Sequence, residues 1–167
     1  KIYLARKMTG LTAKELVEES VQAARTAEEL YPGVKLLDPV KADNHKAMDS
    51  VVAAKEEMLR GFWRRDKEMI RVAHVLIDMT GPAKSEGVAH EIGYARYCLW
   101  KPVIRIWPGL PASVARIEDD IIVEHFVAAL DVAEQLWGTR TKRIIWRLKM
   151  LNRCLPKWIM QQLGEFK

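Results

Sequence analysis

The chain of 167 residues is 49% apolar and carries a formal net charge of +5. A chain of this length is most simply one domain with a full hydrophobic core, and no stretch is long or apolar enough to cross a bilayer. The charge is uneven, because residues 139–167 hold eight basic residues and one acid, or +7, which leaves −2 for the remainder. The basic character therefore belongs to the C-terminal segment, and the body is close to neutral.

The cysteines and histidines give no sign of a metal site. Cys98 and Cys154 are far apart and form no C-x-x-C motif, which is typical of a reduced, cytoplasmic protein. The histidines at 45, 74, 90 and 125 lack metal-ligand spacing, and no signal peptide precedes the first apolar run. We therefore expect a cytoplasmic protein with no metal and no other cofactor.

The chain begins with a predicted strand and helix. Residues 2–5 (I-Y-L-A) are typical of a buried strand. Thr12, with Glu15 three residues later, forms a capping box that begins a helix running to about Leu30. One side of this helix is expected to hold the apolar residues Leu16, Val17, Val21, Ala24 and Ala27.

A second strand and a long helical segment follow. Residues 34–37 (V-K-L-L) predict the strand, residues 38–48 a loop, and residues 49–73 a helical pattern in which Gly61 is a candidate break. A break there would put Asp66 in the first turns of a helix, at the carboxyl edge of the sheet. A continuous helix would leave Asp66 in its middle.

Residues 74–106 form a β-turn-α-β unit. H-V-L-I-D at 74–78 predicts a buried strand, a polar turn follows, and residues 86–100 show helical spacing. Residues 103–106 (V-I-R-I) resume as a strand, so the two strands are expected to be parallel neighbours. Glu91 lies about one turn inside the helix, at the edge where open α/β sheets bind ligands.

The rest of the chain completes the pattern. Residues 121–123 (I-I-V) predict a fifth strand, and a helix follows that Gly138 closes. Strands alternating with helices indicate an α/β domain with a doubly wound, five-stranded parallel sheet over residues 1–138. Residues 139–167 predict a basic amphipathic helical tail, which could contact another subunit, a membrane surface or nucleic acid.

Three stretches resemble a known family when they are taken together. They are Y-L-A at 3–5, R-R-D-K-E-M-I at 64–70, and S-E-G-V-A-H-E-I-G-Y-A at 85–95 followed by K-P-V-I. This combination is similar to the nucleoside 2-deoxyribosyltransferase superfamily, which includes the nucleoside 5′-monophosphate N-glycosidases. The resemblance covers about residues 1–136 and implies a flavodoxin-like fold.

The resemblance implies catalytic roles for three residues. Glu91 takes the place of the nucleophile that attacks C1′ of the sugar, Tyr3 that of the tyrosine that orients it, and Asp66 that of the aspartate beside the nucleobase. The chemistry is sound, because breaking an N-glycosidic bond develops oxocarbenium character that a carboxylate can trap. A second group can supply a proton or a hydrogen bond to the leaving nitrogen. Water or a second base then resolves the glycosyl-enzyme with retention at C1′.

Two departures from the family favour a phosphorylated substrate. Its transferases carry an aspartate six residues before the nucleophile, whereas Ser85 stands here, as a serine does in the monophosphate N-glycosidases, where it helps hold the phosphate. Lys7 takes the place of another phosphate-holding serine, and Arg6 stands where the family has a glycine. A lysine and a serine at one edge suit a phosphate. Gly87 and Trp63 complete the expected substrate contacts.

Each of these residues also has a simpler interpretation. A Glu in the first turns of a helix complements the helix dipole, a Ser caps the helix, and a Tyr or Trp usually packs in a core. Charged residues are often only solvated, which applies to Asp66, Arg6 and Lys7.

The sequence therefore predicts an N-glycosidase that cleaves the base–sugar bond of a nucleoside or 2′-deoxynucleoside 5′-monophosphate through a covalent glycosyl-Glu91 intermediate. The alternatives are a 2-deoxyribosyltransferase that exchanges bases between deoxynucleosides, and a non-catalytic nucleotide-binding protein. Because family members are oligomers, we expect a homo-oligomer, dimeric or larger, with the tail at the subunit contact. Membrane or nucleic acid contact of the tail is not favoured.

Overall fold

The computed structural model describes residues 1–7, 10–42, 55–82, 85–109 and 121–137. The predicted tail and its boundary with the domain lie outside these residues. Within them, no helix has the length and apolarity needed to span a membrane. The elements are β1 (Ile2–Ala5), α1 (Ala13–Leu30), β2 (Leu36–Leu37), α2 (Pro39–Ala42), α3 (Lys55–Val72), β3 (Val75–Asp78), α4 (Glu86–Gly93), the π-helical turn η2 (Tyr94–Cys98), β4 (Val103–Ile106), β5 (Ile121–Val123) and α5 (Phe126–Trp137).

The five strands form one parallel sheet in the order β2-β1-β3-β4-β5. This is the predicted doubly wound arrangement, with the strand order of flavodoxin-like folds. The two strands of the β-turn-α-β unit are parallel neighbours, with Leu76 opposite Val103 and Asp78 opposite Arg105. The predicted second strand is shorter than expected, because only Leu36 and Leu37 pair with β1.

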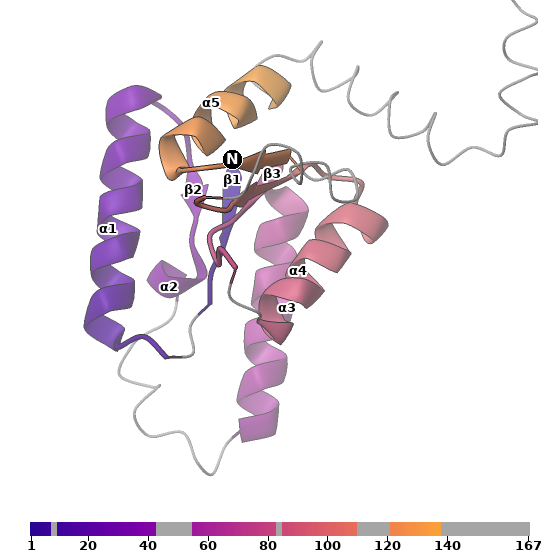
Figure 1. Ribbon diagram of the computed structural model, residues 1–167. Coiled ribbons are helices and arrows are strands. Elements are labelled where there is room, and N and C mark those ends of the chain that lie inside the picture. The colour runs from indigo at the N-terminus through magenta and orange to yellow at the C-terminus, as the bar shows by residue number, and fades with distance from the viewer. Residues whose placement is uncertain (8–9, 43–54, 83–84, 110–120, 138–167) are drawn as a thin grey trace, which may run out of the picture.

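Helices cover both faces of the sheet (Figure 1). One face packs against α1 and α5 through alternate strand residues, which are Ile2, Leu4, Val75, Ile77 and Ile104. The intervening residues Tyr3, Ala5, Leu76 and Val103 pack on the other face, which α3 and α4 cover. This alternation follows from the two-residue period of a strand. It places Tyr3 on the same side of the sheet as the helix that bears Glu91.

The first helix begins with the predicted capping box. The Thr12 hydroxyl accepts a hydrogen bond from the Glu15 amide at 3.2 Å, and a Glu15 carboxylate oxygen accepts one from the Thr12 amide at 2.7 Å. The predicted buried side is only partly right. The stripe facing the sheet consists of Leu16, Ser20, Ala23 and Ala27, whereas Val17 and Val21 are exposed.

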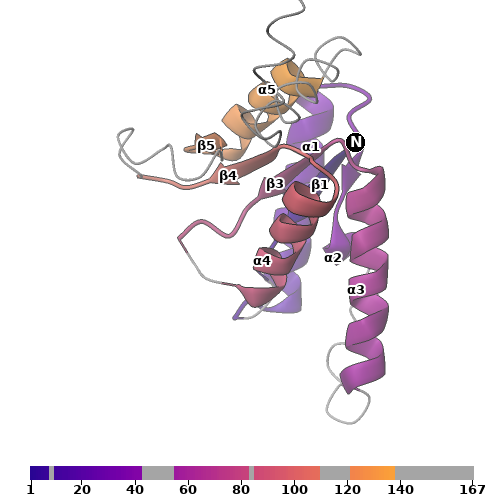
Figure 2. The ribbon, with the colours of Figure 1, turned by 90° about the vertical axis from the view of Figure 1, so that its right-hand side faces the viewer.

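The third helix runs without interruption through Gly61, so the candidate break does not occur and the alternative of a continuous helix is the correct one. With 18 residues it is about 27 Å long, whereas four-residue strands such as β1 and β3 span about 13 Å. Its first turns therefore extend past the carboxyl edge of the sheet (Figures 1 and 2). Asp66 reaches the level of that edge from within the helix.

Candidate functional site

Tyr3 and Glu91 form a buried pair between the sheet and α4. Tyr3 is fully buried on β1, and its hydroxyl donates a hydrogen bond to Glu91 Oε1 at 3.0 Å. Glu91, in the second turn of α4, is 8% exposed. A carboxyl group that only complemented the helix dipole would lie in solvent. Tyr3 is therefore both a core residue and the partner of the candidate nucleophile.

Burial dominates the electrostatics of Glu91. It raises the pKa of this carboxyl to about 8, with smaller contributions in the same direction from Asp66 and Asp78, while the hydrogen bond from Tyr3 opposes the rise. Burial, together with the charges of Glu91 and Asp66, also raises the pKa of Tyr3 far above its ordinary value. The phenol therefore stays protonated and acts as the hydrogen-bond donor of the pair.

The second oxygen of the Glu91 carboxyl lacks the hydrogen bond that the first one accepts. Oε2 is buried and has no hydrogen-bond partner among the described residues. Buried polar atoms are usually paired, and exceptions concentrate at functional sites. One oxygen of this carboxyl is thus fixed by Tyr3, while the other is available to a reacting atom.

Asp66 lies close to this pair and is not a solvated charge. It is 8% exposed, and Arg65 Nη2 lies 3.1 Å from its Oδ1. Its charge acts on both Tyr3 and Glu91. The structure therefore brings together the three residues predicted to be catalytic, from β1, α3 and α4.

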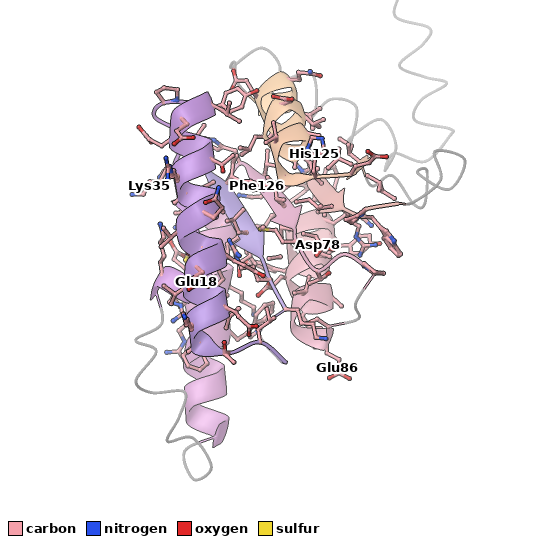
Figure 3. The ribbon with its side chains drawn as sticks, turned by 60° about the vertical axis from the view of Figure 1, so that its left-hand side comes forward. Glu18, Lys35, Asp78, Glu86, His125 and Phe126 are labelled. Carbon is pink, nitrogen blue, oxygen red and sulfur yellow. The ribbon has the colours of Figure 1, made fainter. Side chains whose placement is uncertain are left out.

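Ser85 and Gly87 lie at the start of α4. Ser85 is the N-cap, and its hydroxyl accepts a hydrogen bond from the Val88 amide at 3.5 Å. It also lines a cavity of about 370 Å³, so capping and substrate contact are compatible. Gly87 is exposed. Figure 3 shows this end of α4 at Glu86, with Asp78 deeper in the molecule at the end of β3.

Trp63 packs between α3 and α4. Its ring centroid lies 6.2 Å from that of His90 and 6.1 Å from that of Tyr94. Lys67 Nζ lies 4.9 Å from the Trp63 ring centroid and 5.5 Å from that of Tyr94. These contacts give Trp63 the simpler packing role, and its stacking on a nucleobase stays a prediction.

Arg6 joins three elements of the scaffold. Its side chain is 2% exposed, and its Nη2 lies 3.1 Å from Asp38, directly before α2, while Nη1 lies 3.2 Å from Glu19 on α1. Asp38 in turn accepts a hydrogen bond from the Val40 amide at 3.0 Å, so part of the predicted 38–48 loop is the short helix α2. Arg6 is therefore not an exposed loop charge, whereas Lys7 beside it is partly exposed. Contact of either residue with a substrate stays a prediction.

Two residues next to the site were not predicted. Asp78 ends β3 and Arg105 lies opposite it on β4, with 3.3 Å between Asp78 Oδ2 and Arg105 Nε. A charged residue closing a buried apolar run was a usable signal for Asp78. Among the described residues, no group of three or more His, Cys, Asp or Glu side chains could hold a metal ion.

A solved structure with the same fold is the 2-deoxyribosyltransferase of the psychrotolerant bacterium Bacillus psychrosaccharolyticus, at 21% identity and a TM-score of 0.56, with 78% of this chain and 90% of that one covered. A conserved protein from Enterococcus faecalis V583 (17%, TM-score 0.48, coverage 78% and 86%) and the CMP N-glycosidase BcmB from Clostridium botulinum (14%, TM-score 0.44, coverage 80% and 98%) are less similar. No protein-family model and no curated protein sequence matches the chain. The likeness to the first structure confirms the predicted flavodoxin-like fold.

Removing the cation of the Arg6 cluster should destabilise the protein. Arg6→Met leaves Asp38, whose side chain is 1% exposed, buried without its ion-pair partner. We expect a loss of about 3–5 kcal/mol in the free energy of unfolding, measured by urea denaturation. The double variant Arg6→Met/Asp38→Asn should recover part of this loss. An unchanged urea midpoint for Arg6→Met would contradict the role of the cluster.

The raised pKa of Glu91 predicts a pH-dependent gain in stability for Glu91→Gln. Between about pH 4.5 and 8 the folded carboxyl keeps its proton while the unfolded one loses it. Folding stability of the native chain therefore falls across this window, whereas the neutral amide has no such loss. From pH 5 to pH 8, the melting temperature of Glu91→Gln should rise relative to that of the native chain. The corresponding difference in folding stability is on the order of a few kcal/mol. A difference that does not vary with pH would show that the carboxyl is not buried in its neutral form.

Proposed function

We propose that the protein is an N-glycosidase that cleaves the base–sugar bond of a nucleoside or 2′-deoxynucleoside 5′-monophosphate. Glu91 is the nucleophile, Tyr3 orients it, and Asp66 assists the departing base. One observation carries the proposal above the others: Glu91 is a buried carboxyl with one oxygen bonded to Tyr3 and the other without a partner among the described residues. This geometry suits an atom that must approach a carbon.

The proposed reaction has two steps. The ionised Glu91 carboxylate attacks C1′, and the C1′–N bond breaks with its electron pair going to the base nitrogen. Asp66 in its acid form donates its proton or a hydrogen bond to that nitrogen. Water then attacks C1′ and gives up a proton to Asp66 or to the departed base, the bond to Glu91 breaks, and the sugar 5′-phosphate leaves with retained configuration. Two successive inversions at one carbon produce that retention.

The position of the site supports this proposal. Tyr3, Asp66 and Glu91 come from β1, α3 and α4, at the carboxyl edge where the strand order reverses between β1 and β3. Doubly wound folds bind ligands at this switch point. A 2-deoxyribosyltransferase of the same fold is in keeping with chemistry at a base–sugar bond.

We further propose that the protein is a homo-oligomer.

Two alternatives use the same residues differently. A 2-deoxyribosyltransferase would resolve the glycosyl-enzyme with a second base in place of water. A non-catalytic nucleotide-binding protein would have no need for a desolvated carboxyl at C1′, because burying Glu91 without ionic compensation costs stability. The buried pair of Tyr3 and Glu91 therefore favours an enzyme.

Product analysis tests the proposal directly. The chain should release free base from at least one member of a panel of nucleosides, 2′-deoxynucleosides and their 5′-monophosphates. Chromatography of the products detects the released base. Glu91→Ala should lower that rate by about a thousandfold or more. Glu28→Ala, which changes an exposed glutamate of α1 away from this cavity, is the control and should not. Near-normal turnover by a folded Glu91→Ala variant would contradict the mechanism. Release of base that requires a second free base would identify a transferase.

The pH dependence of kcat/KM tests the roles of Glu91 and Tyr3. A nucleophile must be ionised, so kcat/KM should rise with pH through about 8, the pKa of Glu91. Tyr3→Phe removes the hydrogen bond that lowers this pKa, so the rise should move to higher pH by about 1–2 pH units. Tyr97→Phe, which changes an exposed tyrosine, should leave the profile unmoved. If kcat/KM instead fell through this range, Glu91 would be acting as a general acid.

A further inference from the structure

The cavity beside Ser85 is lined by a positively charged side chain that is not among the predicted site residues. It lies between the carboxyl ends of β3 and β4 and the first two turns of α4, and its volume is about 370 Å³. Val88, Ile92 and Trp107 form much of its apolar wall, and Arg105 lies among its polar residues with Asp78 and Ser85. A volume of this size lies within the range of small-molecule sites.

The sheet register places Arg105 at this position. Ala5, Asp78 and Arg105 are cross-strand neighbours on β1, β3 and β4. Each follows by two residues a side chain packed under α3 and α4, namely Tyr3, Leu76 and Val103, so all three are on the face that bears Glu91. The row runs along the carboxyl edge, directly beside the proposed reaction centre.

Asp78 holds the arginine from one side. Its Oδ1 accepts hydrogen bonds from the Thr80 amide at 2.9 Å and the Thr80 hydroxyl at 2.6 Å, which fixes the carboxylate. Its Oδ2 lies 3.3 Å from Arg105 Nε. The Asp78 side chain is 6% exposed and that of Arg105 29% exposed. The Asp78 carboxylate is thus the more buried member of the pair in the cavity wall, and the Arg105 guanidinium is the more accessible one.

The charges around the site make a cation necessary for an anionic substrate. Asp66 and Asp78 both lie close enough to Glu91 to raise its pKa. A phosphate group with nearly two negative charges would be repelled by these carboxylates unless a positive group compensated them. Among the described residues lining the cavity, Arg105 supplies that positive charge, whereas Lys7 is not one of them.

We propose that Arg105 binds the 5′-phosphate of a nucleotide in this cavity, with the Ser85 hydroxyl as a second contact. This inference rests on the proposed function and names the residue that sets its preference for monophosphates. A guanidinium suits the role because its planar fork matches two phosphate oxygens. Asp78 orients the guanidinium from the opposite side, so its ion pair with Arg105 is a support for the phosphate site.

The experiment compares two substitutions in the pair. Arg105→Gln should lower the ratio of kcat/KM for a 5′-monophosphate to that for the matching nucleoside about ten- to a hundredfold. Arg71→Gln removes the same charge from an exposed arginine near the C-terminal end of α3 and should leave the ratio unchanged. Asp78→Asn keeps an acceptor for Thr80 and the positive charge of Arg105 but removes the ion pair that orients the guanidinium, so it should lower the ratio less than Arg105→Gln does.

Three results would overturn the proposal. They are an unchanged ratio in Arg105→Gln, a loss of preference in Asp78→Asn equal to that in Arg105→Gln, or equal reaction of nucleosides and monophosphates with the native chain. The second result would show that the pair only supports the scaffold. A loss of stability alone cannot mimic the expected result, because both substrates are measured on the same folded variant.

Binding separates this inference from the proposed function. Titration calorimetry on Glu91→Gln, with and without Arg105→Gln, measures affinity for the same panel of monophosphates without turnover. If the double variant binds monophosphates more weakly than Glu91→Gln does, but the native chain releases no base from any compound, the results would support Arg105 and reject the glycosidase. Base release with an affinity indifferent to Arg105 would support the glycosidase and reject Arg105.

Discussion

The burial of Glu91 is the constraint on which the site depends. A carboxyl group taken out of water needs a partner, and here the hydroxyl of Tyr3 provides one at 3.0 Å. Tyr3 can do so only because β1 is an inner strand, between β2 and β3. A slip of one residue in the register of β1 would turn Tyr3 to the opposite face, under α1 and α5. The register of the sheet and the geometry of the Glu91 carboxyl are therefore set together.

The same register gathers charge at one edge of the sheet. Asp78 and Arg105 are opposite each other on β3 and β4, and Asp66 approaches from α3. The body of the chain is nearly neutral in sequence, yet the carboxyl groups of Asp66 and Asp78 both lie close enough to Glu91 to act on its pKa. Repulsion from Asp66 and Asp78 adds to burial, the larger cause, in raising the pKa of Glu91, and Arg65 and Arg105 lie beside these two acids. A single substitution among them would alter the others.

Sequence patterns predicted the strands, the order of elements and the position of Glu91, because these depend on local apolar runs and on caps such as that of Thr12. The same local information failed where tertiary packing decides. Gly61 was a candidate break, but an isolated Gly costs a helix only about 1 kcal/mol, and α3 runs through it. The burial of Arg6 could not be predicted, since it depends on how α1 and Asp38 pack beside β1. The pairing of Asp78 with Arg105 depends on the register of two strands that were predicted only to be neighbours.

The uninterrupted α3 explains how Asp66 reaches the site from the middle of a helix. Because the helix is about twice as long as the strands it covers, residues far from its N-terminus still lie at the carboxyl edge. Its rotation is fixed by Trp63 and Lys67, which contact the Tyr94 ring on the adjoining turn. These two residues flank Asp66 on α3, and Tyr94 follows Glu91 by three residues. The contact between the two helices therefore sets the spacing of the two carboxyl groups, which makes the packing of α3 against α4 part of the site.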